Sequence, residues 1–272
     1  MASFIGAVDN WMRSVALGVQ EYFTLGQRAA RFTFARPFYW TDFVLQMDRI
    51  GVGSVPIVLL TGAFTGMVLA LQSSVELGRF GADIYLGSLV GASMGRELGP
   101  VISALMVAGR AGSGIAAELG SMRVTEQIDA MESLGTDPIK KLVTPRLLAG
   151  ITMLPVLTIL ADVVGIIGGL IIAVFRVDLP AAIYMRGVWA TFATSGYIFG
   201  VFPRDFVSGL AKPIVFGAII TLTGAYYGLT ASGGTEGVGR ATTRAVVTAS
   251  ILILASDYFL TQLFLVIVPP LT

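Results

Sequence analysis

The amino-acid sequence predicts an all-α integral membrane protein, with an N-terminal interfacial amphipathic helix, five transmembrane helices and a short cytoplasmic helix between the second and third spans. Of its 272 residues, 55% are hydrophobic and only 13% are charged, and the mean hydropathy is +0.81. Polar residues this scarce cannot cover a soluble surface, which excludes a soluble globular enzyme and a disordered chain. At about 20 apolar residues per crossing, the chain has room for five or six membrane helices.

The composition also excludes several kinds of chemistry. The net charge is +1, which gives no reason to expect nucleic acid or another polyanion as a partner. The chain has no Cys and no His, so it lacks disulfides, thiolate chemistry, most zinc sites and imidazole acids or bases. We therefore expect no metal, no cofactor bound by this chain and no catalytic residues, and we predict that it is not an enzyme.

The first 48 residues are predicted to form an interfacial helix region that precedes a transmembrane domain over residues 49–272. Apolar residues recur there at intervals of three and four, while polar and charged residues take the opposite face. This pattern is typical of an amphipathic helix that lies on a bilayer, and a helix packed on a partner protein is the alternative. The apolar positions are Phe4, Val8, Trp11, Met12, Val15, Val19, Tyr22 and Phe23.

Five long apolar segments follow, each able to cross about 30 Å of hydrocarbon. They cover residues 52–77, 84–117, 147–175, 214–231 and 245–268. A sixth stretch, residues 181–202, is apolar but broken by Arg186 and by small residues, and the distribution of Lys and Arg favours five spans over six only slightly. We expect the N-terminus inside, the C-terminus outside and residues 178–213 in external or re-entrant helices.

The second apolar segment carries glycine at every fourth position. Gly87, Gly91, Gly95 and Gly99 share one helical face, and a repeated pattern of small residues lets another helix approach closely. Shorter versions of the pattern occur at Gly62 and Gly66 and elsewhere in the apolar segments. The sequence therefore predicts a tightly packed bundle, which could extend to a second copy of the chain.

Charged residues within or beside apolar segments are expensive and are therefore candidates for function. Four of them are singled out here: Arg96, Glu97, Lys212 and Asp257. Adjacent residues on a helix point about 100° apart, so Arg96 and Glu97 cannot simply pair with each other. Opposite charges make Asp257 with Lys212, and Glu97 with a basic group on another helix, the plausible pairs. Pro100 also frees a backbone carbonyl in this part of the second segment.

Two roles remain open for these four residues at this stage. The charges could be neutralised in pairs that fix the register of the helices, or they could form a polar lining for a substrate cavity. Asp162, a single acid in the third apolar segment, is expected to be structural.

A short amphipathic helix is predicted in the loop between the second and third spans. Its apolar residues recur at helical spacing and alternate with acidic ones, Gly135 is placed to end it, and Pro138 prevents its return. Such a helix suits docking into a groove on a cytoplasmic partner, and a helix resting on the membrane surface is the alternative. The residues concerned are Val124, Glu126, Gln127, Ile128, Asp129, Met131, Glu132 and Leu134.

The glycine-rich stretch at residues 233–240 does not predict a nucleotide site. It lacks the spacing of a phosphate-binding loop, and none of the three lysines, Lys140, Lys141 and Lys212, follows a glycine. We expect a tight cytoplasmic turn between the last two spans instead.

Four stretches resemble a known family of membrane proteins. They are GRELGP at residues 95–100, AGRAGS at 108–113, ELGSMRVTEQIDAMESLG at 118–135 and GVGRATTR at 237–244. Together they are similar to the MlaE (YrbE) family of ABC-transporter permeases, which take part in phospholipid and MCE-type lipid transport. The likeness runs from about Arg49 to the end of the chain and is most specific between Gly95 and Pro145.

The resemblance implies a permease of the bacterial inner membrane that moves phospholipid, or a similar hydrophobic substrate, to or from an MCE-domain protein. It implies a homodimer, a separate pair of ABC ATPases that bind ATP and Mg, and in some systems a STAS-domain protein. The helix at residues 124–134 would then be the coupling helix that docks on the ATPase. Arg96, Glu97, Lys212 and Asp257 resemble charged positions near the lipid cavity of the family.

Three other functions compete with this interpretation. An ion-gradient-driven secondary transporter is the main alternative, although the chain shows no inverted repeat and few membrane acids. An enzyme that acts on lipid would need a nucleophile with an adjacent base or a cluster of metal ligands, and the sequence offers neither. A structural scaffold for other membrane proteins would have no cavity and no bound lipid.

Overall fold

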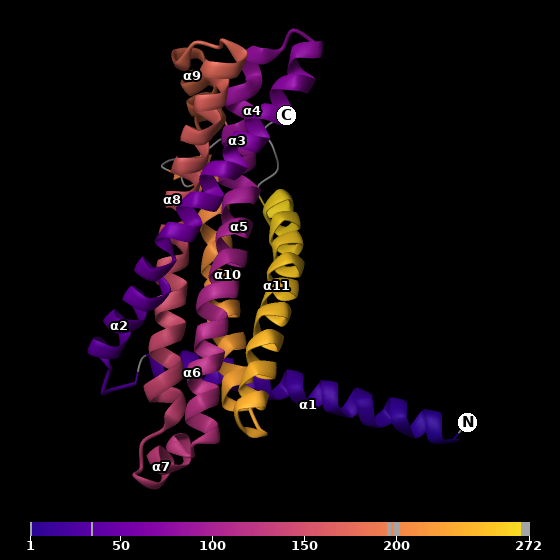
Figure 1. Cartoon of the computed structure of the whole chain (residues 1–272), viewed down its shortest axis with the longest axis vertical. Helices are drawn as coiled ribbons and strands as arrows, with labels where there is room; N and C mark the ends of the chain where they lie inside the picture. The colour runs from indigo at the N-terminus through magenta and orange to yellow at the C-terminus, as the bar shows by residue number, and fades with distance from the viewer. Residues whose placement is uncertain (1, 34, 195–196, 199–201, 268–272) are drawn as a thin grey trace.

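The computed structural model of the chain describes residues 2–33, 35–194, 197–198 and 202–267. In this part of the chain, five helical segments are long and apolar enough to cross a membrane, which confirms the predicted class of all-α, multi-pass membrane protein. They form an elongated bundle (Figure 1). The five segments are Trp40–Arg79, Asp83–Val124, Ile139–Val177, Gly209–Leu229 and Gly234–Val266.

The bundle is built from helices that follow one another with short connections. The helices are α1 (Ala2–Thr33), α2 (Trp40–Ile50), α3 (Val55–Arg79), α4 (Leu86–Ser93), α5 (Gly99–Val107), α6 (Ser113–Val124), α7 (Gln127–Ser133), α8 (Thr144–Val177), α9 (Ala181–Thr194), α10 (Arg204–Leu229) and α11 (Gly234–Ile267). Short 3₁₀ turns join some of them at η1 (Val52–Ser54) and η2 (Asp83–Tyr85), and π-helical turns do so at η3 (Met94–Leu98), η4 (Ala108–Gly112) and η5 (Ile139–Val143).

The described part of the ambiguous stretch, residues 181–194, 197–198 and 202, does not span. Helix α9 has 14 residues, and at about 1.5 Å per residue it is too short to cross about 30 Å of hydrocarbon. Two strands of two residues each, β1 (Tyr197–Ile198) and β2 (Phe202–Pro203), pair antiparallel between α9 and α10. The end of the bundle that carries α9 is opposite the end that carries α7 (Figure 1).

The fourth span begins earlier than the sequence suggested. We expected it to start after Pro213, but α10 begins at Arg204 and contains Pro213. Proline lacks a backbone N–H and usually marks a helix boundary, whereas inside a membrane bundle neighbouring helices compensate for the lost hydrogen bond. As a result, Lys212 lies within the helix rather than at its start, and its side chain projects into the bundle.

The second span contains two π-helical turns, η3 and η4, which are wider than the turns of an α-helix. Its π-helical turn η3 comes directly before Pro100, whose ring would collide with the carbonyl of Arg96 in a regular α-helix. The amide of Gly99 instead reaches back five residues to the carbonyl of Met94. The widened turn leaves the Arg96 carbonyl for a partner from another helix.

The glycine pattern of the second span packs against α9. The contacting residues are spaced four apart on both helices, so three glycines of the pattern each face one residue of α9 on successive helical turns. At the first of these positions a Cβ atom would come within 2.1 Å of the carbonyl oxygen of Tyr184, so the backbones touch. The facing pairs are Gly87 with Tyr184, Gly91 with Val188 and Gly95 with Phe192.

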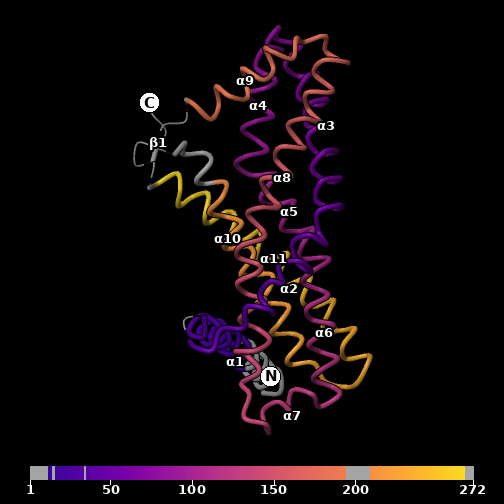
Figure 2. The backbone as a smooth tube through the Cα atoms, turned by 90° about the vertical axis from the view of Figure 1, so that its left-hand side faces the viewer, coloured from indigo at the N-terminus to yellow at the C-terminus, as the bar shows by residue number. Residues whose placement is uncertain are grey.

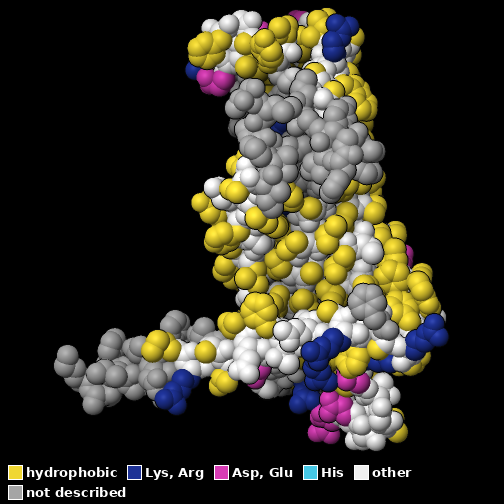
Figure 3. Space-filling view, turned by 180° about the vertical axis from the view of Figure 1, so that it is seen from behind, with side chains coloured by type: hydrophobic (Ala, Val, Ile, Leu, Met, Phe, Trp, Pro, Cys, Tyr) yellow, Lys and Arg dark blue, Asp and Glu magenta, His cyan; other side chains and the backbone are white. Residues whose placement is uncertain are grey.

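Helices α3 and α8 approach each other in the same manner. A Cβ atom on Gly66 would lie only 1.9 Å from the carbonyl oxygen of Gly165, and Gly62 meets Ala161 one turn away. The core of the bundle is apolar, and apolar side chains also cover its middle on the outside, while charged side chains gather at its ends (Figure 3). This distribution is the one expected for a bundle surrounded by lipid.

Helix α1 crosses the end of the bundle from which α7 projects. It runs sideways in Figure 1 and is seen end-on in Figure 2, so it lies across the spans as an interfacial helix does. Leu25 and Ala29 are buried against the bundle, whereas Phe23 is exposed. The side chains of Phe4, Val8, Trp11 and Val15, on which the predicted apolar face partly depends, lie outside the described part of the chain.

Candidate functional site

Helix α7 is the predicted helix between the second and third spans, but it is shorter than expected. We predicted a start at Val124, whereas Val124 is the last residue of α6 and α7 begins at Gln127. Between them Glu126 adopts a left-handed conformation with φ of 59°, and its amide bonds to the carbonyl of Arg123. Such a conformation is uncommon for a residue other than glycine, so the sequence carried no signal for this turn.

Two interactions hold α7 on the end of the bundle. Ile128 is 3% exposed and packs inward, and Asp129 pairs with Arg123 at the end of α6. At the other end of α7, Gly135 has φ of +76°. The amide of Gly135 donates to the carbonyl oxygen of Glu132, and the amide of Thr136 donates to the carbonyl oxygen of Met131. This is a Schellman ending, which confirms the predicted role of Gly135.

The outer face of α7 is acidic with an apolar tip. Leu134 is 84% exposed, Met131 is half-buried, and acidic side chains gather on this projection (Figure 3). An exposed leucine beside carboxylates is suited to a partner surface with an apolar pocket and basic surroundings. The exposed polar residues of the predicted set are Glu126, Gln127, Asp129 and Glu132.

Glu118 ties three helices together close to α7. Its Oε1 lies 3.0 Å from Nη1 of Arg49 in α2, and its Oε2 lies 2.9 Å from Nη2 of Arg146 in α8. The Arg146 side chain is only 4% exposed and also donates to the carbonyl oxygen of Leu142. Glu118 lies in a recognised motif, but the sequence did not identify this pair of contacts because its partners are distant along the chain.

Arg110 strengthens the same region. Its Nη1 donates to the carbonyl oxygen of Arg49 at 2.9 Å and to Oγ of Ser54 at 3.0 Å. Its guanidinium lies against Gly53, where a Cβ atom would come within 2.2 Å of Nη2. The motif at residues 108–113 therefore fixes the second span to the start of the first.

Three of the four predicted intramembrane charges, Glu97, Lys212 and Asp257, form one cluster. The Lys212 ammonium donates to Oε2 of Glu97 at 2.6 Å and lies 3.0 Å from Oδ1 of Asp257. Both predicted ion pairs are therefore present, and the basic partner of Glu97 is the same lysine that pairs with Asp257. The Lys212 side chain is 2% exposed, so the two acids compensate a charge that lipid and water do not reach.

The remaining contacts of the cluster involve backbone and a hydroxyl group. Lys212 also donates to the carbonyl oxygen of Arg96 at 3.1 Å, and Thr261 donates to Oε1 of Glu97 at 3.2 Å. Thr261 was not predicted, although it lies four residues after Asp257 and therefore on the same face of α11. The Arg96 side chain itself is exposed, and the Glu97 side chain is 42% exposed.

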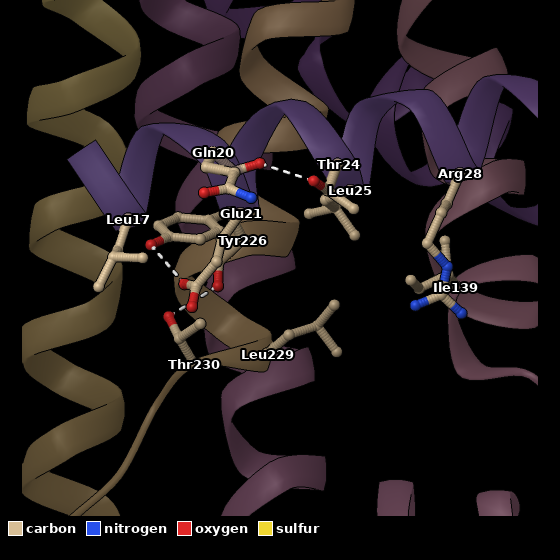
Figure 4. A pocket seen from close by; sticks show the side chains of 10 residues that line it. All are labelled: Leu17, Gln20, Glu21, Thr24, Leu25, Arg28, Ile139, Tyr226, Leu229 and Thr230. Atoms are coloured by element: carbon tan, nitrogen blue, oxygen red, sulfur yellow. Dashed lines mark hydrogen bonds between the residues drawn. The ribbon is translucent and has the colours of Figure 1, made fainter. Parts of the chain in front are cut away.

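A hollow of about 480 Å³ lies between α1 and the bundle (Figure 4). Glu21 of α1 accepts a hydrogen bond at 3.3 Å from the hydroxyl of Tyr226 in α10. Arg28 lines the other side and pairs at 3.0 Å with Asp137, which follows α7. Tyr22 is a hydrogen-bond partner of Thr223, and burial raises the pKa of its phenol. Helix α1 is thus joined to both α10 and the α7 region.

Comparison with known proteins agrees with this architecture. Residues 43–263 match the family model described as Permease MlaE. A protein of Rickettsia conorii named probable ABC transporter permease is 46% identical over 84% of this chain and 85% of its own length. A protein of Synechocystis with the same description is 42% identical over 80% of each chain.

A third similar protein carries a more specific name. The intermembrane phospholipid transport system permease protein MlaE of Haemophilus influenzae is 39% identical over 81% of each chain. The match to the family model covers α7, the charge cluster and nearly all of the five spans, of which the first begins at Trp40 and the last ends at Val266. An ion-gradient-driven transporter is not supported by any of these similarities.

Proposed function

The chain belongs to the MlaE family and is an ABC-transporter permease, and we propose that it moves phospholipid, or a similar hydrophobic substrate, between the bacterial inner membrane and an MCE-domain partner. The energy comes from a separate pair of ABC ATPases, which bind ATP and Mg, so ATP hydrolysis is assigned to the partner and not to this chain. The name of the Haemophilus protein supports phospholipid as the substrate class.

The observation that carries the proposal is the position of α7. It is a short helix beyond the end of the spans, held by Ile128 and the Arg123–Asp129 pair, with Leu134 and carboxylates turned outward. We assign α7 as the coupling helix that docks on the ATPase. Its two flanking helices continue directly into the second and third spans, so a movement of α7 is transmitted to the bundle.

The same end of the molecule is assigned to the cytoplasm. Helix α1, α7 and the turn before α11 lie together there (Figures 1 and 2). Lys and Arg side chains lie in α1, in η5 beside α7 and in the first turns of α11, among them Arg28, Lys140 and Arg240. Lys and Arg favour the cytoplasmic side of membrane proteins. The N-terminus is then cytoplasmic, and five crossings place the C-terminus outside.

A second copy of the chain is the proposed partner within the membrane. Helix α11 turns large apolar side chains outward beside the charge cluster, among them Ile251, Leu254 and Tyr258. A lipid cavity between two such surfaces would have apolar walls for the acyl chains. The exposed Arg96 side chain could then receive the phosphate, while the buried Lys212 holds Glu97 and Asp257 in place. A STAS-domain protein on the ATPase is a further expected partner.

A transfer assay tests the proposal. The complex is purified with its ATPase, reconstituted in liposomes, and given the MCE-domain protein as the second carrier; movement of a fluorescent phospholipid between the two is then followed. We expect transfer with ATP and none with a non-hydrolysable analogue. Transfer driven by an ion gradient in liposomes that lack the ATPase would contradict the proposal and support a secondary transporter.

A further inference from the structure

A second pocket, with a volume of about 480 Å³, lies between α8, α9, α10 and the turn η3. Its walls are almost entirely apolar and include Val163, Val188, Trp189 and Phe192. The volume is within the range of small-molecule binding sites. Among the described residues that line it, one side chain is ionisable, the carboxyl group of Asp162.

Asp162 has no partner within the described residues that compensates its burial. Its Oδ1 atom is buried without a hydrogen bond. This oxygen packs directly against Gly99, because a Cβ atom added to Gly99 would lie only 1.6 Å from it. The residue lies near the middle of the third span, Ile139–Val177, where an unpaired polar group is costly. A purely structural role, as we expected for Asp162, calls for a partner group that the described structure does not contain.

The pocket is separate from the Lys212 cluster. Gly95 and Gly209 line it, and their backbones touch, since a Cβ atom on Gly209 would lie 2.2 Å from the carbonyl oxygen of Gly95. The described residues that line the pocket do not include Glu97, Lys212 or Asp257.

We propose that this pocket binds a long-chain amphiphile whose polar end carries a hydrogen-bond donor, a hydroxyl or an amine. The apolar walls receive the hydrocarbon chain, and the second carboxyl oxygen of Asp162, Oδ2, accepts the hydrogen bond from the polar end. The site is independent of the proposed transport function.

Photolabelling of the full chain in phosphatidylcholine nanodiscs tests the site. The probe is a twelve-carbon alcohol with a diazirine in the chain, the control probe is the corresponding alkane, and labelled peptides are mapped by mass spectrometry. We expect the alcohol to label the α9 segment around Val188 and the facing part of α8. The alkane should label these segments about tenfold less at the same concentration, as loss of one hydrogen bond predicts.

Two variants make the result decisive. Val163 is 50% exposed, so Val163→Trp can fill the pocket from its mouth without disturbing the core. The matched control is Val156→Trp, because Val156 is 45% exposed and lies seven residues earlier on the same face of α8. We expect labelling of α9 to be lost in V163W and kept in V156W. Equal labelling of the wild type and V163W means contact with surrounding lipid only and overturns the proposal.

The role of Asp162 is tested separately. Asp162→Leu removes the acceptor and is expected to lower labelling by the alcohol to the level of the alkane, whereas Asp162→Asn keeps a carbonyl acceptor and is expected to retain most of it. If alcohol and alkane label the wild type and D162L alike, Asp162 does not recognise the donor and the proposed ligand class is wrong.

Discussion

Lys212 donates a hydrogen bond to the backbone carbonyl oxygen of Arg96 at 3.1 Å, and this carbonyl is the one that Pro100 leaves without its helical partner. The proline opens the helix at η3, and a lysine from α10 occupies the opening. The same ammonium neutralises Glu97 and Asp257. One side chain therefore joins the second, fourth and fifth spans through both charge and backbone.

Replacement of Lys212 by methionine is expected to destabilise the bundle strongly. The variant leaves two acids without their cation in the interior of the membrane protein, and removal of one partner from a buried charge group costs about 3–5 kcal/mol. The free energy of unfolding in mixed micelles, measured by titration with dodecyl sulfate, checks this. The triple variant K212M/E97Q/D257N should recover most of the loss, and no recovery would show that charge compensation is not the main role of Lys212.

Loss of the Glu118 carboxylate is expected to loosen the region beside α7. Glu118→Gln leaves the buried Arg146 without its anion, and we expect a loss of about 1–2 kcal/mol, moderated by the partial exposure of Glu118. Thermal unfolding in detergent measures the effect. The matched control is Glu76→Gln, which breaks an exposed pair with Arg79 and should change stability by less than about 0.5 kcal/mol. Equal effects in the two variants would contradict a special role for Glu118.

The contact between α3 and α8 predicts a steric effect at Gly66. Gly66→Ala places a Cβ atom against the backbone of Gly165, which cannot move away without separating the helices. Overpacking of this kind lowers the free energy of unfolding by about 1–3 kcal/mol. Gly78→Ala on the same helix meets only an ordinary contact at 3.5 Å, with the Asp83 side chain, and should be neutral or slightly stabilising. Melting temperatures of the two variants in the same detergent decide between these outcomes; a neutral G66A would refute the close packing.

The exposed tip of α7 is expected to matter for the ATPase and not for the fold. Leu134→Asp changes an exposed side chain, so stability should shift by less than about 0.5 kcal/mol. The amount of ATPase that copurifies should nevertheless fall about tenfold or more if Leu134 anchors the interface. Ile128→Ala is the contrasting variant, because it removes the buried anchor of α7 and should lower both stability and copurification. Undiminished ATPase in L134D would show that α7 does not dock there.

The sequence predicted those features that depend on local pattern or on charge. Long apolar segments indicate spans, and opposite charges in hydrocarbon must find each other, so both the five spans and the partners of Lys212 were expected. The glycine pattern predicted a close helix contact but not that α9 would make it, since such a face is compatible with any small-residue partner. The roles of the charge cluster and of α7 in transport remain predictions.

Other features were missed because no local signal specifies them. Glu126 adopts a left-handed turn without glycine, so the start of α7 was misplaced by three residues. Pro213 was taken as a boundary, although the surrounding bundle accommodates it within α10. The contacts of Glu118 with Arg49 and Arg146 join positions far apart in the chain, and only the folded bundle brings them together.

Native mass spectrometry tests the central claim most directly. The tagged chain is extracted gently from the membranes of its own host, and the masses of subunits and retained lipids are read from the same spectra. We predict two copies of this chain, two copies of an ABC ATPase and bound phospholipid. A single chain with neither ATPase nor phospholipid, under conditions that preserve a known ABC transporter from the same membranes, would contradict the account.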